Sequence, residues 1–207
     1  MTLIDISPPV DATIAVWPGD TPYTRNVSLD MHAGANLTLS DIRTTVHVGA
    51  HADAPSHYSA AGADIASRSL HYYVGPCVVL HVNIRRGLRI LPEHLEGKAI
   101  TAARVLLRTN TFPDPRQWNE DFSSLSPQLV EWLHAQGVIT IGIDTPSVDP
   151  MHDKVLEAHL ALHAHDMANL EGLVLDGVAE GEYELIALPL RLSGADGSPV
   201  RAVLRTI

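Results

Sequence analysis

Four side chains that can bind metal ions or transfer protons lie within eleven residues of the sequence. They are His47, His51, Asp53 and His57, and the residues between them are mostly small or apolar. Because all four numbers are odd, an extended backbone would place the four side chains on one face. A helix fits less well, because Asp53 would lie opposite the histidines and Pro55 disfavours a helical turn. We therefore expect an extended or looping segment whose imidazoles and carboxylate suit zinc, with manganese or iron as alternatives.

A second group of potential ligands lies in residues 157–171. Its candidates are His159, His163, His165, Asp166 and Glu171. A closed metal site needs more ligands than the first segment supplies, so we expect at least one of these candidates to complete it. The spacing of His159 and His163 places both on one face of a helix, but the residues alone do not select the ligand.

The elements that must position these groups are mostly strands. Runs rich in β-branched or apolar residues predict strands at residues 3–6, 13–16, 37–46, 78–82, 105–109, 138–143, 183–190 and 200–205. The run 138–143 shows little alternation, which indicates a central strand covered on both faces. Ser126, Pro127 and Gly137 delimit one predicted helix, and residues 155–167 form a second. This pattern predicts one mixed α/β or α+β domain over residues 1–207, with strands outnumbering helices.

Composition excludes several classes of protein. The net charge is −10 and no run of Lys and Arg occurs, so nucleic acid is not an expected partner. No apolar stretch is long enough to span a membrane, and the N-terminus does not resemble a signal peptide. The one cysteine, Cys77, excludes an internal disulfide and fits a cytoplasmic location. The sequence also lacks a Gly-x-Ser-x-Gly elbow, a phosphate-binding loop and a Cys-x-x-Cys pair.

Residues 47–57 resemble the His-x-Gly-[Thr/Ala]-His-x-Asp-x-Pro-x-His motif of the metal-dependent cyclase family. Alanine stands at position 50, where the broad family often has threonine. Further segments resemble the family in the expected order: Trp17-Pro-Gly-Asp20, residues 142–149, residues 169–173 and residues 188–200. The resemblance therefore spans nearly the whole chain.

The resemblance implies a swivelling β/β/α fold, rich in strands with few helices, usually in homodimers. It also implies two zinc ions per subunit, with manganese as an alternative. The implied ligands are His47, His51 and Asp53 for one ion, and Asp53, His159 and Glu171 for the other. Asp53 and Glu171 would bridge the ions, His57 would be the general acid/base, and Trp17 would contact the substrate. No role is implied for His163 or His165.

The activity implied by the resemblance is hydrolysis of N-formyl-L-kynurenine to L-kynurenine and formate in tryptophan breakdown. Metal-activated hydroxide would attack the formyl carbon. Three alternatives remain open at this point. They are an amidase of the isatin-hydrolase type in the same family, a metal-binding protein without catalysis, and a globular domain with many surface histidines.

Overall fold

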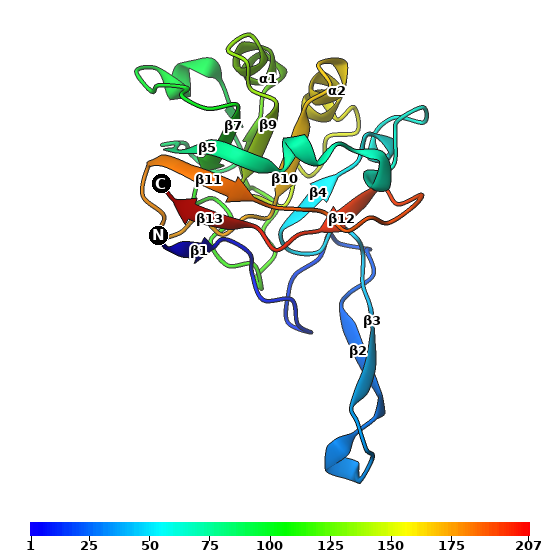
Figure 1. Cartoon of the computed structure of the whole chain (residues 1–207). Coiled ribbons are helices and arrows are strands. Elements are labelled where there is room, and N and C mark those ends of the chain that lie inside the picture. The colour runs from blue at the N-terminus through cyan, green and yellow to red at the C-terminus, as the bar shows by residue number, and fades with distance from the viewer.

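A nine-stranded sheet forms the centre of the computed structural model, which describes residues 1–207 (Figure 1). Its strands are β1 (Leu3–Asp5), β4 (His51–Asp53), β5 (Val74–His81), β7 (Arg104–Arg108), β9 (Thr140–Ile143), β10 (Ala168–Glu171), β11 (Gly181–Ile186), β12 (Gly197–Pro199) and β13 (Val203–Thr206). They are ordered β1-β13-β11-β5-β7-β9-β10-β4-β12. The four middle strands, β5, β7, β9 and β10, run parallel, and every other pairing in this sheet is antiparallel. The mixed, strand-rich α/β architecture predicted from the sequence is confirmed.

Two hydrophobic cores lie on opposite faces of this sheet. Along β5 the side chains alternate, so Cys77 and Val79 enter one core while Val78 and Leu80 enter the other. Helices α1 (Pro127–His134) and α2 (Glu157–Ala164) cover the second core. The first core joins residues from both ends of the strand order, including Ala52 of β4, so the sheet curls around it.

The helices form where sequence punctuation predicts them. The Ser126 hydroxyl accepts a hydrogen bond from the Leu129 amide at 3.0 Å, and Pro127 occupies the first turn of α1. Gly137 follows the helix in the left-handed conformation, with φ at 85°. Helix α2 lies inside the predicted range 155–167. No helix has the length and apolar character that crossing a membrane requires.

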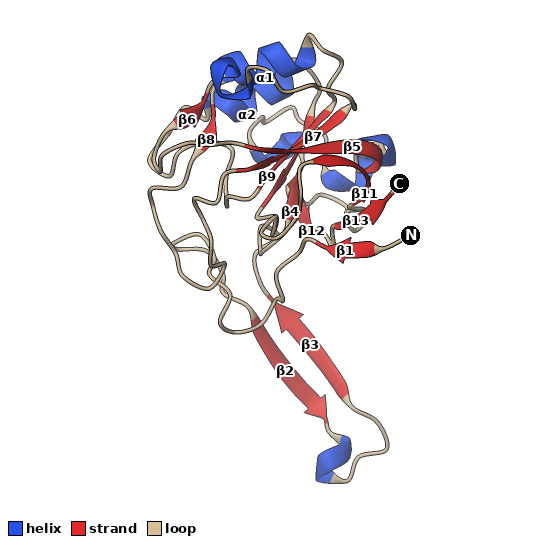
Figure 2. Ribbon diagram, turned by 90° about the vertical axis from the view of Figure 1, so that its left-hand side faces the viewer, coloured by secondary structure: helices blue, strands red, loops and turns tan.

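A long β-hairpin projects from the body of the molecule (Figures 1 and 2). It pairs β2 (Thr24–Leu29) with β3 (Leu39–Arg43), and the 3-10 turn η1 (Met31–Ala33) lies near its tip. Every residue of both strands is exposed. The large apolar side chains exposed along it are Val27, Leu29, Met31, Leu37, Leu39 and Ile42. The strand predicted at 37–46 therefore exists as β3, but it lies outside the main sheet.

Some expectations from the sequence were wrong. Residues 13–16 form the end of a turn and an irregular loop rather than a strand, although Ile14 is buried. Strands β2 and β10 were not predicted, because their sequences are largely polar. The short elements are the parallel pair β6 (Arg89–Ile90) and β8 (Ser124–Leu125), and the 3-10 turns η2 (Pro55–His57), η3 (Ile65–Ser67), η4 (Leu70–Tyr72) and η5 (Pro92–Leu95).

Candidate metal centre

The candidate site lies at the carboxyl ends of the parallel strands, where open α/β sheets commonly bind ligands. Asn110, Asp144 and Glu171 lie at or just beyond the ends of β7, β9 and β10, and all three line one pocket. Strand β4 pairs antiparallel with β10, and the register sets His51 opposite Glu171. The sheet thus brings the two histidine-containing segments of the sequence together.

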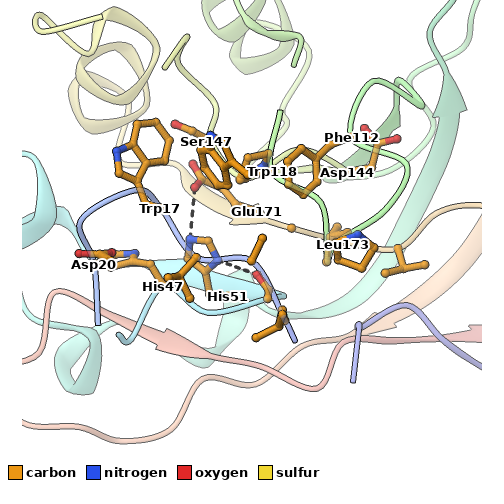
Figure 3. Close-up of a pocket in the computed structure, with 18 of the residues that line it drawn as sticks. Trp17, Asp20, His47, His51, Phe112, Trp118, Asp144, Ser147, Glu171 and Leu173 are labelled. Atoms are coloured by element: carbon orange, nitrogen blue, oxygen red, sulfur yellow. Dashed lines mark hydrogen bonds and ion pairs between the residues drawn. The ribbon is translucent and has the colours of Figure 1, made fainter. Parts of the chain in front are cut away.

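Two buried carboxylates form the middle of the site. His51 Nε2 lies 3.5 Å from Asp53 Oδ1. The same nitrogen lies 3.2 Å from Glu171 Oε2 (Figure 3). On the other side, His159 Nε2 lies 3.3 Å from Asp53 Oδ2 and 3.4 Å from Glu171 Oε1. Each carboxylate therefore presents one oxygen to each of two half-sites. His47 joins the His51 half-site, with its Nδ1 2.9 Å from Asp53 Oδ1.

Each of the three imidazoles uses its second nitrogen for an outer hydrogen bond. The bonds run from His51 Nδ1 to the Gly49 carbonyl at 2.9 Å, from His47 Nε2 to Asp196 Oδ2 at 3.0 Å, and from His159 Nδ1 to Asp149 Oδ2 at 2.8 Å. Carbonyl and carboxylate oxygens only accept, so the outer nitrogens carry the protons. If the rings are neutral, their inner lone pairs face carboxylate oxygens, an arrangement that a cation between them would stabilise.

The donor set fits metal ions in spacing and chemistry. Two donors bound about 2.0–2.1 Å from a tetrahedral zinc ion would lie about 3.3 Å apart. The distances from His51 and His159 to the two carboxylates, 3.2–3.5 Å, agree with this spacing. Asn169 Nδ2 also donates to Asp53 at 2.6 Å and to Glu171 at 2.9 Å, whereas its buried Oδ1 has no partner. An unpaired buried oxygen beside the carboxylates is a further feature that a cation could satisfy.

Without a metal ion, the imidazoles and carboxylates shift one another's pKa. Burial works against the charged form of Asp53, but hydrogen bonds from His159 and His47 hold its pKa well below the usual value. Burial also works against the charge of His159, yet Asp149, Asp53 and Glu171 raise its pKa well above the usual value. Protons and metal ions would therefore compete for the same nitrogens.

His57 lies at the open side of the cluster, where η2 ends. Its ring centroid is 4.2 Å from that of His47, and 34% of its side chain is exposed. Nδ1 of His57 lies 3.3 Å from Asp196 Oδ2. Because Asp196 occupies Nδ1, the other ring nitrogen of His57 is free to exchange a proton with a bound molecule.

The pocket beside the cluster has aromatic walls. Its cavity of about 320 Å³ is lined by Trp17, Phe112 and Trp118 together with four of the histidines (Figure 3). The rings of Trp17 and Trp118 meet edge to face, with centroids 5.2 Å apart. Phe112 contacts Trp118 in the same way at 5.7 Å. This volume and lining suit a small aromatic molecule.

All the candidate site residues from the sequence lie at this pocket or in the cluster beside it. They are Trp17, His47, His51, Asp53, His57, His159 and Glu171. The geometry that unites them differs from the expected extended run, because only residues 51–53 form a strand. His47 lies in a turn and His57 in a 3-10 turn. His163 is exposed and His165 stacks on His134 at 4.2 Å.

Sequence reasoning missed three polar residues that hold the cluster in place: Asp149, Asn169 and Asp196. Asn169 is two residues before Glu171, so recognising β10 as a strand would have placed both side chains on one face. Asp149 and Asp196 lie in segments that resemble the family, but nothing in their local sequence indicates contact with a histidine.

Fold and site together define a mixed α/β protein whose cluster of imidazoles and carboxylates is suited to metal ions. The chain belongs to the cyclase family, because the model of that family, described as a putative cyclase, matches residues 4–150. It is 50% identical to the kynurenine formamidase of Bordetella pertussis (strain Tohama I) over 99% of this chain and 98% of that protein. The kynurenine formamidase of Bordetella petrii is 48% identical over the same shares.

Solved structures share the fold. A potential metal-dependent hydrolase with cyclase activity aligns with a TM-score of 0.85 at 24% identity, covering 98% of this chain and 96% of that chain. Isatin hydrolase A from Labrenzia aggregata, bound to benzyl benzoate, aligns with a TM-score of 0.82 at 22% identity, covering 98% and 93%. At these identities the likeness extends to the fold alone.

Proposed function

We propose that this chain is a kynurenine formamidase, which hydrolyses N-formyl-L-kynurenine to L-kynurenine and formate in tryptophan breakdown. The observation that carries the proposal is its 50% identity with kynurenine formamidase of Bordetella pertussis over nearly the full length of both chains. The aromatic pocket beside the imidazole and carboxylate cluster supports it, because the substrate joins an aryl ring to a formamide.

The proposed cofactor is a pair of zinc ions, with manganese as the alternative. His47, His51 and Asp53 would hold one ion, and His159 and Glu171 together with Asp53 would hold the other. Bound there, the ions would polarise the formyl carbonyl and lower the pKa of the attacking water. The support is the paired half-sites, each built from one oxygen of Asp53 and one of Glu171.

The remaining roles follow from where each side chain lies. Trp17, Trp118 and Phe112 would hold the aryl ring and exclude water from it. The C–N bond of the formamide breaks as the aniline nitrogen leaves, and this nitrogen is a poor leaving group unless it is protonated. His57 would donate that proton, since its ring reaches the cluster and Asp196 anchors its Nδ1.

The proposal includes a homodimer. The hairpin of β2 and β3 exposes apolar side chains on strands that pair only with each other. A two-stranded hairpin is marginally stable alone in water, so burial against a second copy would stabilise it. A cytoplasmic location remains a prediction from the sequence.

An assay for formate from N-formyl-L-kynurenine, run with and without chelator, tests the proposed function. We expect turnover that is lost on chelation and restored by adding zinc, with manganese compared in parallel. Isatin serves as the cyclic amide in the same assay. Faster hydrolysis of the isatin ring than of N-formyl-L-kynurenine would favour an amidase of the isatin-hydrolase type. Tight zinc binding without turnover of either compound would favour a metal-binding protein without catalysis.

A further inference from the structure

Asp149 is a fully buried carboxylate that lies behind His159, on the side away from Asp53. Its Oδ2 accepts hydrogen bonds from the ring Nδ1 of His159 at 2.8 Å and from the His159 amide at 3.0 Å. Its Oδ1 accepts from the Ala158 amide at 3.0 Å. Leu156 precedes α2 with φ at 58° and gives no side-chain cap, so Asp149 supplies the cap from the loop before the helix.

An arginine holds this carboxylate in place. Nη1 of Arg89 lies 2.8 Å from Asp149 Oδ1 and also donates to the Leu125 carbonyl at 2.6 Å. Arg89 and Leu125 belong to β6 and β8, which pair with each other. Nη2 of Arg89 reaches Asp153 at 2.5 Å and Glu157 at 3.2 Å. The guanidinium therefore offsets the buried charge of Asp149 and limits its movement.

The three imidazoles of the cluster differ in their outer partners. His51 has a backbone carbonyl, and the partner of His47 is Asp196, whose side chain is 49% exposed. Only His159 has an outer carboxylate that is both fully buried and paired with an arginine. Loss of Asp149 should consequently disturb one half-site and spare the other.

We infer that Asp149 is a positioning residue that fixes the ring and tautomer of His159, keeping Nε2 directed at the second metal position. This inference rests on the proposed metal centre. A carboxylate behind a ligating histidine typically contributes about 10–100-fold to metal affinity. Helix capping alone accounts for the two amide hydrogen bonds, but not for the bond to the ring.

Asp153 provides a matched control. It accepts hydrogen bonds from two backbone amides before α2, those of Val155 and Leu156, and it binds the same arginine. It makes no hydrogen bond or ion pair with His159. The experiment is a competition titration of the metal-free protein with a chromophoric zinc chelator. We expect Asp149→Asn to lower the affinity for one of the two zinc ions about 10–100-fold and to leave the affinity for the other unchanged. Asp153→Asn should bind both ions as the wild type does, and equal titration curves for the two variants would overturn the inference.

A second measurement separates positioning from a purely structural role. We expect both variants to lower the Tm of the metal-free protein to a similar degree, whereas only Asp149→Asn should reduce the further rise in Tm that zinc produces. An equal zinc-dependent rise in both variants would count against the inference.

A third measurement needs no folded Asp149 variant. In zinc-loaded wild type, ¹⁵N-resolved imidazole spectra should show His159 with its proton on Nδ1, the signal being assigned by its loss in His159→Gln. A proton on Nε2 instead would overturn the inference. If the wild type binds zinc and hydrolyses formylkynurenine while Asp149→Asn matches Asp153→Asn, only this inference fails. If the wild type binds no zinc, the proposed metal centre fails.

Discussion

At the scale of single residues, His57 and the proposed ligands should respond differently to substitution. His57 lies at the open side of the cluster, while His51 and His159 are buried within it. We expect the His57→Ala variant to bind as much zinc as the wild type. Its kcat should fall by a factor of about 10²–10⁴, the usual contribution of a general acid or base. Metal analysis and steady-state kinetics on the same preparation check both expectations, and near-normal turnover would remove His57 from the mechanism.

The metal-free protein should lose stability as pH rises through the range where His47 titrates. Burial works against the charge of His47, but hydrogen bonds to Asp53 and Asp196 raise its pKa from 6.5 to about 9. Protonated His47 thus stabilises the fold fully below pH 6.5, and this contribution disappears as pH rises through 9. At about 1.4 kcal/mol per pKa unit, the contribution is about 3 kcal/mol.

Urea unfolding gives the free energy of unfolding of the metal-free wild type and of His47→Gln between pH 6 and pH 9.5. The contribution of His47 is the difference between the two proteins in how this free energy falls with pH. With zinc bound the sign should reverse, because zinc requires the neutral imidazole and its affinity rises with pH. Parallel pH profiles for the two metal-free proteins would show that His47 carries no such charge.

At the scale of elements, one close backbone approach supports the site. Gly172 follows β10 with φ at 63°, and a Cβ added there would lie 2.2 Å from the Gly49 carbonyl oxygen. That carbonyl accepts the hydrogen bond from His51 Nδ1. We expect Gly172→Ala to lower the free energy of unfolding by more than about 1 kcal/mol and to weaken zinc binding.

The control for this prediction is Gly177→Ala. Gly177 has φ at 74°, and an added Cβ would meet nothing within 4 Å, so only backbone strain remains. Urea unfolding and zinc titration of both variants distinguish the effect of backbone strain, which both share, from the effect of displacing the Gly49 carbonyl, which only Gly172→Ala has. Unchanged zinc affinity in Gly172→Ala would mean that His51 does not depend on this contact.

The elements that could be predicted from the sequence are those whose apolar residues are the ones buried in the folded protein. Strands β5, β7 and β9 contain apolar runs that are buried on both faces, and α1 has its own cap and terminating glycine. Strand β10 was not predicted because Asn169 and Glu171 are polar yet buried at the candidate site. Strands are usually recognised by apolar residues at their buried positions. The strand predicted at residues 13–16 is the opposite error, an apolar pattern without a strand. Ile14 is apolar because it packs against Gly49 from an irregular loop.

The same distinction applies to the site. Residues 47–57 carry their ligand types close together, so their gathering could be predicted from spacing alone. Asp196 lies 149 residues from His47 along the chain, and local sequence does not encode such an encounter. Asp149 is only ten residues before His159, but their contact depends on how the loop before α2 folds back onto the helix. Their contacts with His159 and His47 emerge only from the folded arrangement.

At the scale of the whole molecule, the projecting hairpin should decide the oligomeric state. We expect wild type to have the mass of a dimer in light scattering, and the double variant Leu39→Lys/Ile42→Lys to have that of a monomer. Both side chains are more than half exposed in the single chain, at 53% and 62%, so their loss should cost the fold little. Ser40→Lys is the control on the same strand and should remain dimeric. A monomeric wild type at micromolar concentration would contradict the proposed assembly.

The edge of the main sheet has a consequence for the newly made chain. Strand β1 pairs only with β13, in a register that sets Leu3 opposite Arg205. During synthesis β1 leaves the ribosome long before β13, because every other strand of the sheet lies between them in the sequence. Strand β1 therefore has no native partner until β13 has been made, and this edge of the sheet closes late in folding.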